Sequence, residues 1–417
     1  MLKIKKILFL IFIALVIFFI SFASLVKKKT FLPVSNQSSS WWEVQSIDTM
    51  KYSRDLAREK LNDPGFDAII DEQVKNISQT GATHVAIATP YDEEFLPYLW
   101  RWVAAARKYK LNVWFRGNWS GWEQWFGYTG ISREEHNQKT QEFILQNKSL
   151  FADGDIFTPC PEAENGGPGD PRITGDVNGH RRFLIQEYQV TQKAFAKIGK
   201  KVRSNFNSMN GDVARLIMDK ETTKALDGVV VIDHYVSTPK ILAKDIKDMA
   251  SQSSGKVVLG EFGAPIGDIH GAMSEQEQAQ WLNEALEEVT KIPQVIGLNY
   301  WTNMGSSTRL WESDGKARKA VGILYSFYTP QALSGTVKNQ LDQPVSGAKI
   351  SSFPGNTVTD GQGKFKLSYR ISKPELEVEA EGFVGQKVRL DESFSEVEII
   401  LVKEHEGFFF KIRKFLQ

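Results

Sequence analysis

The pattern of apolar and polar residues predicts a barrel over residues 41–330. Short apolar runs alternate there with longer stretches of helical periodicity. The predicted strands are 43–47, 83–89, 112–116, 155–158, 201–205, 228–232, 256–259 and 295–299. Helical stretches follow most of them, for example 94–109, 133–147, 182–198 and 275–290. Eight strands alternating with helices predict an α/β fold with a parallel sheet closed into a (β/α)8 TIM barrel. A doubly wound open sheet is the alternative, but no strand is followed by a glycine-rich nucleotide fingerprint.

After residue 330 the apolar residues alternate with a period of two, which is typical of strands with one buried face. The predicted strands are 333–337, 348–350, 364–367, 376–378, 387–390 and 397–401. The Asp-Gly-Gln-Gly run at 360–363 predicts a hairpin turn. We therefore expect an antiparallel β-sandwich over 331–403, followed by a basic aromatic tail at 404–417.

The first residues predict a membrane segment. Residues 7–26 are uncharged and almost wholly apolar, long enough for a helix to span a bilayer. Lysines flank this run on both sides, which weakens the prediction of its orientation. An uncleaved signal anchor over 1–30 is favoured, because the run is long for a signal peptide; a signal peptide cleaved near 21–23 is the alternative. Either interpretation places the rest of the chain outside the cytoplasm, beyond a linker at 31–40 rich in Ser, Asn, Gln and Pro.

Composition excludes several classes of function. The net charge of +1 gives no electrostatic attraction toward nucleic acid. The single cysteine, Cys160, excludes an internal disulfide framework and a site built from several thiolates. No metalloprotease, phosphate-loop or serine-hydrolase motif is present, so we expect neither a metal nor an organic cofactor. The oligomeric state is not predicted.

Polar and aromatic side chains follow the predicted barrel strands, where the reactive groups of such barrels lie. The candidate site residues are Arg116, Asn118, Trp119, Trp122, Glu162, Glu164, Asn165, Asn205, His234, Tyr235, Glu261 and Trp301. Cleavage of a glycosidic bond with retention needs two carboxyl groups about 5–5.5 Å apart. A glutamate after the fourth strand and one after the seventh are able to meet across the barrel mouth.

The run Gly260-Glu261-Phe262-Gly263 and the terminal Trp301 resemble the clan A retaining glycoside hydrolases, such as cellulases and mannanases. The resemblance implies that Glu261 is the nucleophile and that a glutamate after the fourth strand is the acid/base. It also implies that the pair His234-Tyr235 lies near the nucleophile, with the tyrosine hydroxyl orienting it, and that Trp301 floors the sugar subsite. We further expect Arg116 to keep Glu261 ionised.

The chain departs from the clan immediately before the acid/base. The clan has an asparagine there that contacts the sugar 2-hydroxyl, whereas Pro161 precedes Glu162 and an alanine precedes Glu164. That contact must then come from Asn165 or Asn205, or be absent. Glu162 is preferred as the acid/base because it lies nearer the strand end. Glu164 is then either a sugar-binding group or a group that supports the residues contacting the sugar.

Tryptophans after the third strand suggest a sugar platform, since apolar sugar faces stack on aromatic rings. We expect Trp114 in the core, Trp119 or Trp122 facing the ligand, and Asn118 at the polar rim.

The sandwich resembles the carboxypeptidase-regulatory-like family, through Gly335-Thr-Val337 and the run from Asp360 to Phe365. That resemblance implies a structural or adhesive module. For the whole chain we expect a retaining, endo-type glycosidase acting outside the cytoplasm on β-linked oligo- or polysaccharides. A transglycosylase, a carbohydrate-binding pseudoenzyme and a structural envelope protein are the alternatives.

Overall fold

The computed structural model describes residues 26–27, 41–352, 355–370, 375–390 and 396–404. Two compact units can be distinguished, one formed by residues 41–329 and the other by the remaining described residues. The predicted membrane helix and the C-terminal tail fall almost wholly outside the described residues. Within the described part of the chain, no helix combines the length and apolarity needed to cross a bilayer.

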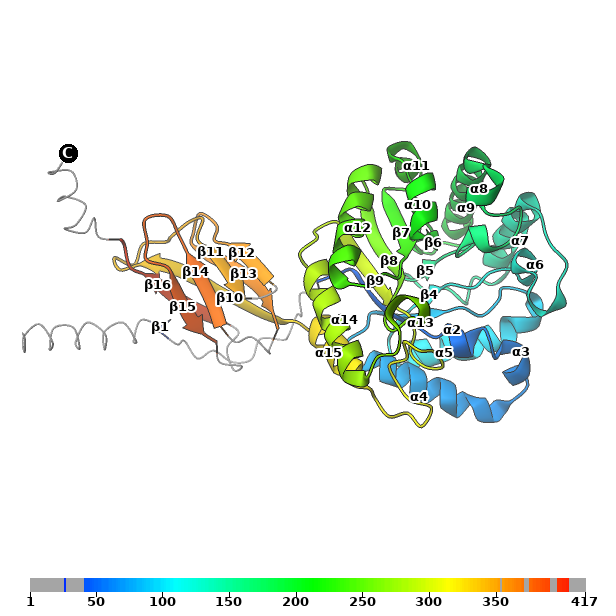
Figure 1. Ribbon diagram of the computed structural model, residues 1–417, viewed down its shortest axis with the longest axis horizontal. Helices are drawn as coiled ribbons and strands as arrows, with labels where there is room; N and C mark the ends of the chain where they lie inside the picture. The colour runs from blue at the N-terminus through cyan, green and yellow to red at the C-terminus, as the bar shows by residue number, and fades with distance from the viewer. Residues whose placement is uncertain (1–25, 28–40, 353–354, 371–374, 391–395, 405–417) are drawn as a thin grey trace, which may run out of the picture. The chain divides into compact units, whose positions relative to one another are not determined.

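The larger unit is an α/β domain built on one curled, eight-stranded parallel sheet, with helices around its outer face (Figure 1). The strand order is β5-β4-β3-β2-β9-β8-β7-β6. The strands are β2 Val44–Asp48, β3 His84–Ile87, β4 Asn112–Phe115, β5 Ile156–Phe157, β6 Ser208–Asn210, β7 Val229–Asp233, β8 Lys256–Phe262 and β9 Val295–Tyr300. A parallel bridge between Ile156 and Arg203 joins β5 to the segment before β6, so the sheet is consistent with a TIM barrel.

Helices follow most of these strands. The longer ones are α4 Asp67–Ser78, α5 Leu96–Lys108, α7 Arg133–Gln146, α9 Val177–Lys197, α12 Pro239–Ser253, α14 Glu275–Val289 and α15 Lys319–Tyr328. The shorter ones are α2 Met50–Ser53, α3 Ala57–Lys60, α6 Ser120–Glu123, α8 Pro171–Thr174, α10 Gly211–Ile217, α11 Lys220–Ala225 and α13 Gly267–His270. Single 3-10 turns are η1 Pro64–Phe66, η2 Glu93–Phe95, η3 Trp125–Gly127 and η4 Ala163–Asn165.

Local sequence explains where several helices begin. The side chains of Ser132, Asp176, Thr238 and Ser274 accept hydrogen bonds from backbone amides three residues later. Each bond satisfies one of the amides that a helix start leaves without a partner. The starts of α7 and α14 lie at the predicted residues, whereas α9 begins five residues before the predicted 182.

Apolar residues fill both sides of the sheet. Inside the barrel lies a small cluster of Val44, Ala86, Trp114, Ile156, Phe206, Val229, Val231 and Val258. A much larger core lies between the strands and the surrounding helices. Because this packing fixes the strands, side chains at their carboxyl ends are held in defined positions.

One predicted barrel strand is misplaced. The segment 201–205 contributes only the bridge at Arg203, and the strand that pairs with β7 is Ser208–Asn210. The registered partners are Ser208 with Val231 and Asn210 with Asp233. The carboxyl end of this strand is therefore Asn210, five residues later than predicted.

The smaller unit holds two four-stranded sheets, β1-β16-β10-β13 and β12-β11-β14-β15, around a shared apolar core. The strands are β1 Val26–Lys27, β10 Gln331–Asn339, β11 Lys349–Ser352, β12 Gly355–Val358, β13 Lys364–Tyr369, β14 Glu375–Glu379, β15 Gln386–Arg389 and β16 Glu396–Leu401.

The strand pairs of this unit are antiparallel as expected, except that β10 and β16 pair in parallel. The Asp360–Gly363 turn joins β12 and β13, which belong to different sheets, so it does not close a hairpin. Val26, the last residue of the predicted apolar span, lies in β1 and pairs with β16. Alternation within a strand reports which face is buried but not which strand is the neighbour.

Candidate active site

Glu261 lies near the carboxyl end of β8, where an irregularity in the sheet sets its position. Ile232 pairs with Leu259 while Asp233 pairs with Glu261, so Gly260 is an extra residue on β8. A Cβ atom on Gly260 would lie 2.2 Å from Oδ1 of Asp233, so only glycine fits there. A bulge of this kind changes the direction in which the next side chain, that of Glu261, points.

Arg116, directly after β4, joins the ends of four strands. Its Nη1 lies 3.0 Å from Oδ2 of Asp48, and its Nη2 lies 3.0 Å from Oδ2 of Asp233 and 3.2 Å from Oε1 of Glu261. Nη1 also donates to the carbonyl of Gly260 at 2.7 Å. Arg116 is buried, and a buried cation needs such partners to offset its lost hydration. Arg116 thus contacts Glu261, which its expected role of favouring the ionised form requires.

Sequence reasoning missed both aspartates. Asp48 is the last residue of β2 and Asp233 the last of β7. Each directly follows a predicted strand, 43–47 or 228–232, and that position was the signal available in the sequence. Asn299 on β9 strengthens the cluster by donating to Asp48 Oδ2 at 2.9 Å and to the Gly260 carbonyl at 2.9 Å.

The carboxyl group of Glu261 is held from two sides. Arg116 contacts Oε1, and the Tyr235 hydroxyl donates to Oε2 at 2.8 Å, as the resemblance to the clan implies for this tyrosine. Burial raises the pKa of Glu261 to about 7, and the charge of Glu162 adds to that rise. Arg116 and the hydrogen bond from Tyr235 act in the opposite direction and favour the ionised form.

Glu162 follows β5 in a left-handed backbone conformation, with a φ of 48°. Its amide donates to the Ser208 carbonyl at 2.8 Å, which fixes the loop against the start of β6. Its Oε2 accepts a 3.0 Å hydrogen bond from Asn165 Nδ2. Burial raises the pKa of this partly exposed carboxyl to about 7, and the charge of Glu164 adds to the rise. Glu162 is therefore a carboxyl group able to hold a proton near neutral pH.

Glu164 is buried and connects two loops. Its Oε1 accepts from the amide of Asn210 at 2.7 Å and from Asn210 Nδ2 at 3.0 Å. Burial raises its pKa, against those hydrogen bonds. Asn210 was missed because the strand it ends was misplaced, and the structure uses Glu164 to tie the loop after β5 to the end of β6.

A further acid, Glu123, belongs to the same region and was not predicted. Its Oε1 accepts from Asn118 Nδ2 at 3.1 Å, and burial raises its pKa to about 7. Its charge also contributes to the raised pKa of Glu162. The mouth therefore holds more carboxyl groups than the two glutamates that the motifs indicate.

The predicted ligand-facing tryptophans are instead part of the core. The indole of Trp119 donates to Thr140 Oγ1 at 2.9 Å. The ring of Trp122 stacks on Phe183, with centroids 4.9 Å apart. Both side chains are buried, because α7 and α9 cover this loop. The expectation for Trp119 and Trp122 is wrong, whereas Trp114 lies in the core as expected.

Asn118 is also buried, so it does not lie at the polar edge of a sugar site as expected. Its Oδ1 accepts from the Trp119 amide at 2.8 Å and lies 2.9 Å from Nε2 of His136. His136 in turn lies 2.6 Å from the buried Glu187. Asn118 therefore links this buried pair to Glu123.

Trp301 and His234 differ in what they face. Trp301 follows β9, is partly exposed, and lies edge-on to Tyr235 with ring centroids 6.1 Å apart. Its aromatic surface thus lies beside the group that holds Glu261. His234 Nε2 lies 2.8 Å from Asp245 on α12, so its side chain is engaged by a helix.

Asn205 does not reach the barrel mouth. Its Nδ2 donates at 3.2 Å to the carbonyl of Leu226, which precedes the start of β7. That position lies toward the amino end of the strand, away from Asp233 and Glu261 at the carboxyl ends. The expectation that Asn205 contacts a sugar is wrong, because the strand continues to Asn210 before it ends.

Among the residues that the structure describes, no group of three or more His, Cys, Asp or Glu side chains is arranged to hold a metal ion. Arg116 is the group that holds the clustered carboxylates together.

Comparisons with known proteins find fold similarity without sequence similarity. No family model and no curated protein matches the chain. A GH5_18 variant from Streptomyces cattleya in complex with Manb1-4GlcNAc matches with a TM-score of 0.53 and 11% identity, over 71% of this chain and 85% of that one. A GH5_18 variant from Bifidobacterium longum, in complex with the same disaccharide, matches with a TM-score of 0.52 and 12% identity, over 73% and 86%.

A third match is β-glucuronidase 2 from Bacteroides uniformis, with a TM-score of 0.45 and 11% identity. It covers 80% of this chain, which spans only 44% of that protein. At these identities the two GH5_18 matches show a shared barrel fold.

Proposed function

We propose that the chain is a retaining glycoside hydrolase of β-linked glycans, with Glu261 as the nucleophile and Glu162 as the acid/base. The observation that supports it best is the contrast between two carboxyl groups, one after the fourth strand of the barrel, β5, and one near the end of the seventh, β8. Glu261 is buried against Arg116 and Tyr235. Glu162 is partly exposed, and among the described residues its carboxyl group accepts a hydrogen bond from the neutral amide of Asn165 alone. The barrel shared with two GH5_18 proteins, each in complex with Manb1-4GlcNAc, agrees with a carbohydrate substrate.

The choice of Glu162 over Glu164 rests on access. Glu164 is 3% exposed, and Oε1 already accepts two hydrogen bonds from Asn210. A general acid must reach the leaving oxygen, which Glu162 is free to do. Glu164 then acts on catalysis through its charge, since that charge raises the pKa of Glu162.

In the first step Glu261 attacks the anomeric carbon while Glu162 transfers its proton to the departing oxygen. The glycosidic bond breaks, and a covalent glycosyl-enzyme forms on Glu261. In the second step Glu162, now ionised, takes a proton from water, and the oxygen of that water displaces Glu261 from the sugar. Tyr235 and Arg116 orient and stabilise the carboxylate of Glu261, and Trp301 offers an apolar surface for the sugar.

The pH dependence tests the acid/base assignment. Glu162 must be protonated to act first, so kcat/KM should fall as pH rises through its pKa of about 7. Glu164→Gln removes a negative charge beside it, which lowers that pKa and shifts the alkaline limb to lower pH. Glu284→Gln, an exposed glutamate on α14, is the control and should leave the profile unchanged. If the alkaline limb of the kcat/KM profile lies at the same pH in Glu164→Gln as in wild type, the assignment of Glu162 as the acid/base is contradicted.

A hydrolysis screen of the full-length chain tests the activity itself. β-Mannan, β-glucan, xylan and galactan oligosaccharides would be followed by proton NMR, which reports the configuration of the first product. We expect release of a β-anomer from a β-linked substrate. An α-anomer would exclude retention, and transfer to added sugar instead of water would favour the transglycosylase alternative. Binding without any product would favour the pseudoenzyme.

We also propose that residues 7–25, the part of the apolar run that precedes β1, tether the protein to a membrane, with the barrel outside the cytoplasm. The support is the length and apolarity of that run. The two-sheet unit is proposed as a structural or adhesive module of the carboxypeptidase-regulatory-like type, on the residues quoted above.

A further inference from the structure

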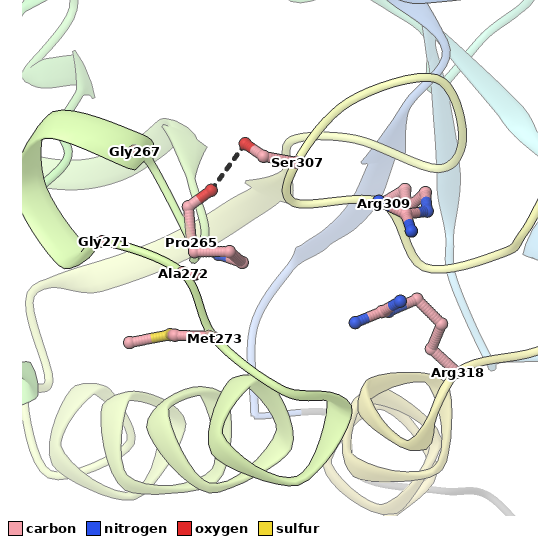
Figure 2. Close-up of a pocket in the computed structure, with 8 residues that line it drawn as sticks. All are labelled: Pro265, Gly267, Gly271, Ala272, Met273, Ser307, Arg309 and Arg318. Carbon is pink, nitrogen blue, oxygen red and sulfur yellow. Dashed lines mark hydrogen bonds between the residues drawn. The ribbon is translucent and has the colours of Figure 1, made fainter.

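A pocket of about 450 Å³ lies beside the loops that follow β8 and β9 (Figure 2). It is lined by Pro265, Gly267, Gly271, Ala272, Met273, Ser307, Arg309 and Arg318. None of these residues is acidic, and none has a role in the proposed mechanism. Its volume lies within the range of roughly 300–1,000 Å³ found for small-ligand sites.

The two arginines form a cationic wall held by one shared carboxylate. Arg309 Nε lies 2.7 Å from Oε2 of Glu312, and Arg318 Nη1 lies 2.5 Å from Oε1 of the same residue. Arg318 Nε also donates to Gln278 at 2.8 Å. Two guanidinium groups against one carboxylate leave an excess positive charge. Arg309 Nη1 donates to the Ser306 carbonyl at 3.3 Å, and within the described part of the chain the Nη2 atom of each arginine has no bonded partner. Figure 2 shows both side chains on the same side of the pocket.

The opposite wall is apolar and open. Met273 and Pro265 lie across from the arginines in Figure 2. Gly267 and Gly271 leave room, since a Cβ on either would meet nothing within 4 Å. A sugar ring with one anionic substituent matches both walls, because its C–H face packs on apolar atoms while the oxyanion pairs with arginine.

The pocket lies on the same end of the barrel as Glu261. Pro265 is four residues beyond Glu261, so their Cα atoms are at most about 14 Å apart. The Ser307 hydroxyl donates to the Pro265 carbonyl at 2.6 Å, which joins the loop after β8 to the loop after β9. The pocket therefore lies within the length of a few sugar units of Glu261 along the chain's own span.

We infer that the pocket is a second glycan subsite, which takes a sugar carrying an oxyanion: a carboxylate as in a hexuronic acid, or a sulfate or phosphate ester. The inference rests on the proposed function, because it assigns the pocket to a neighbouring unit of the same glycan. Arg309 is the residue that selects the anionic sugar, because its side chain is 36% exposed and that of Arg318 only 9%. Glu312 competes with the ligand for both arginines and so limits the strength of binding.

Isothermal titration of the full-length chain tests this subsite without requiring turnover. The probes are a hexuronic-acid disaccharide, its neutral counterpart of the same linkage, a sulfated disaccharide and inorganic phosphate. We expect at least one acidic disaccharide to bind about tenfold or more tightly than the neutral one. Arg309→Gln should abolish this preference, and Glu312→Gln should strengthen it, because the competing carboxylate is gone.

Lys319→Gln is the matched control: it removes the same charge from an adjacent exposed residue that does not line the pocket, and it should change nothing. Equal binding of acidic and neutral disaccharides overturns the inference, as does a preference that survives Arg309→Gln. If inorganic phosphate binds as tightly as the acidic disaccharides, the pocket is a site for a free anion and its assignment to a glycan is overturned. Hydrolysis of neutral glycans is scored separately, so failure of the proposed function is recognised independently of these titrations.

Discussion

Glu261→Gln should lower turnover by at least about 10⁴-fold while leaving the protein folded. Glutamine keeps the volume of the side chain but cannot attack the anomeric carbon, so no glycosyl-enzyme forms. The fold should persist because Arg116 retains the carboxylates of Asp48 and Asp233 as partners. Initial rates on the substrate found in the screen, with circular dichroism as the check on folding, give the measurement.

Mass spectrometry adds a second readout of the same residue. A 2-deoxy-2-fluoro glycoside with a good leaving group should add one sugar mass to the wild-type chain and none to Glu261→Gln. Glu284→Gln, an exposed glutamate on α14, is the control and should behave as wild type. Turnover by Glu261→Gln within tenfold of wild type, or a label on another residue, would refute the nucleophile assignment.

Arg116→Met should destabilise the barrel by about 3–5 kcal/mol at pH 8 and abolish activity. The substitution leaves Asp48, Asp233 and Glu261 buried without the cation that contacts all three. A buried charge without a partner is costly. The decrease in unfolding free energy should therefore far exceed the decrease caused by breaking an exposed ion pair. Chemical denaturation of the two proteins side by side measures the difference.

The pH dependence of that loss separates charge from packing. Burial already raises the pKa of Asp233 and of Glu261, and loss of Arg116 raises both further. The folded variant then binds more protons than the unfolded chain, so its stability falls as pH rises. The difference in unfolding free energy between wild type and Arg116→Met should therefore be smaller at pH 5 than at pH 8. Arg203→Met, which breaks an exposed 2.9 Å pair with Glu43, should cost roughly 1 kcal/mol or less. If the difference in unfolding free energy between wild type and Arg116→Met were the same at both pH values, Arg116 would stabilise the barrel by packing alone.

The barrel could be predicted because the spacing of apolar residues differs between its strands and its helices, and because strands and helices alternate along the chain. Seven of the eight predicted strands overlap the observed ones, and the helices at 133–147 and 275–290 end within a residue of prediction. The exception, 201–205, shows the limit of such reasoning. That segment meets β5 only at Arg203, and the ladder with β7 starts at Ser208. Which part of a polar, extended segment forms a ladder depends on the neighbouring strand, which local sequence does not specify.

The candidate site divides in the same way. By itself the sequence determined the residues that follow each strand, and hence that Arg116, Glu162, Tyr235, Glu261 and Trp301 gather at one end of a barrel. Only the tertiary structure decided that Asp48 and Asp233 share Arg116, that Glu164 binds Asn210, and that Trp119 and Trp122 are covered by helices. The reason is physical: strand order and period follow from residues close in sequence, whereas burial and charge pairing depend on groups from distant strands that only the closed sheet brings together.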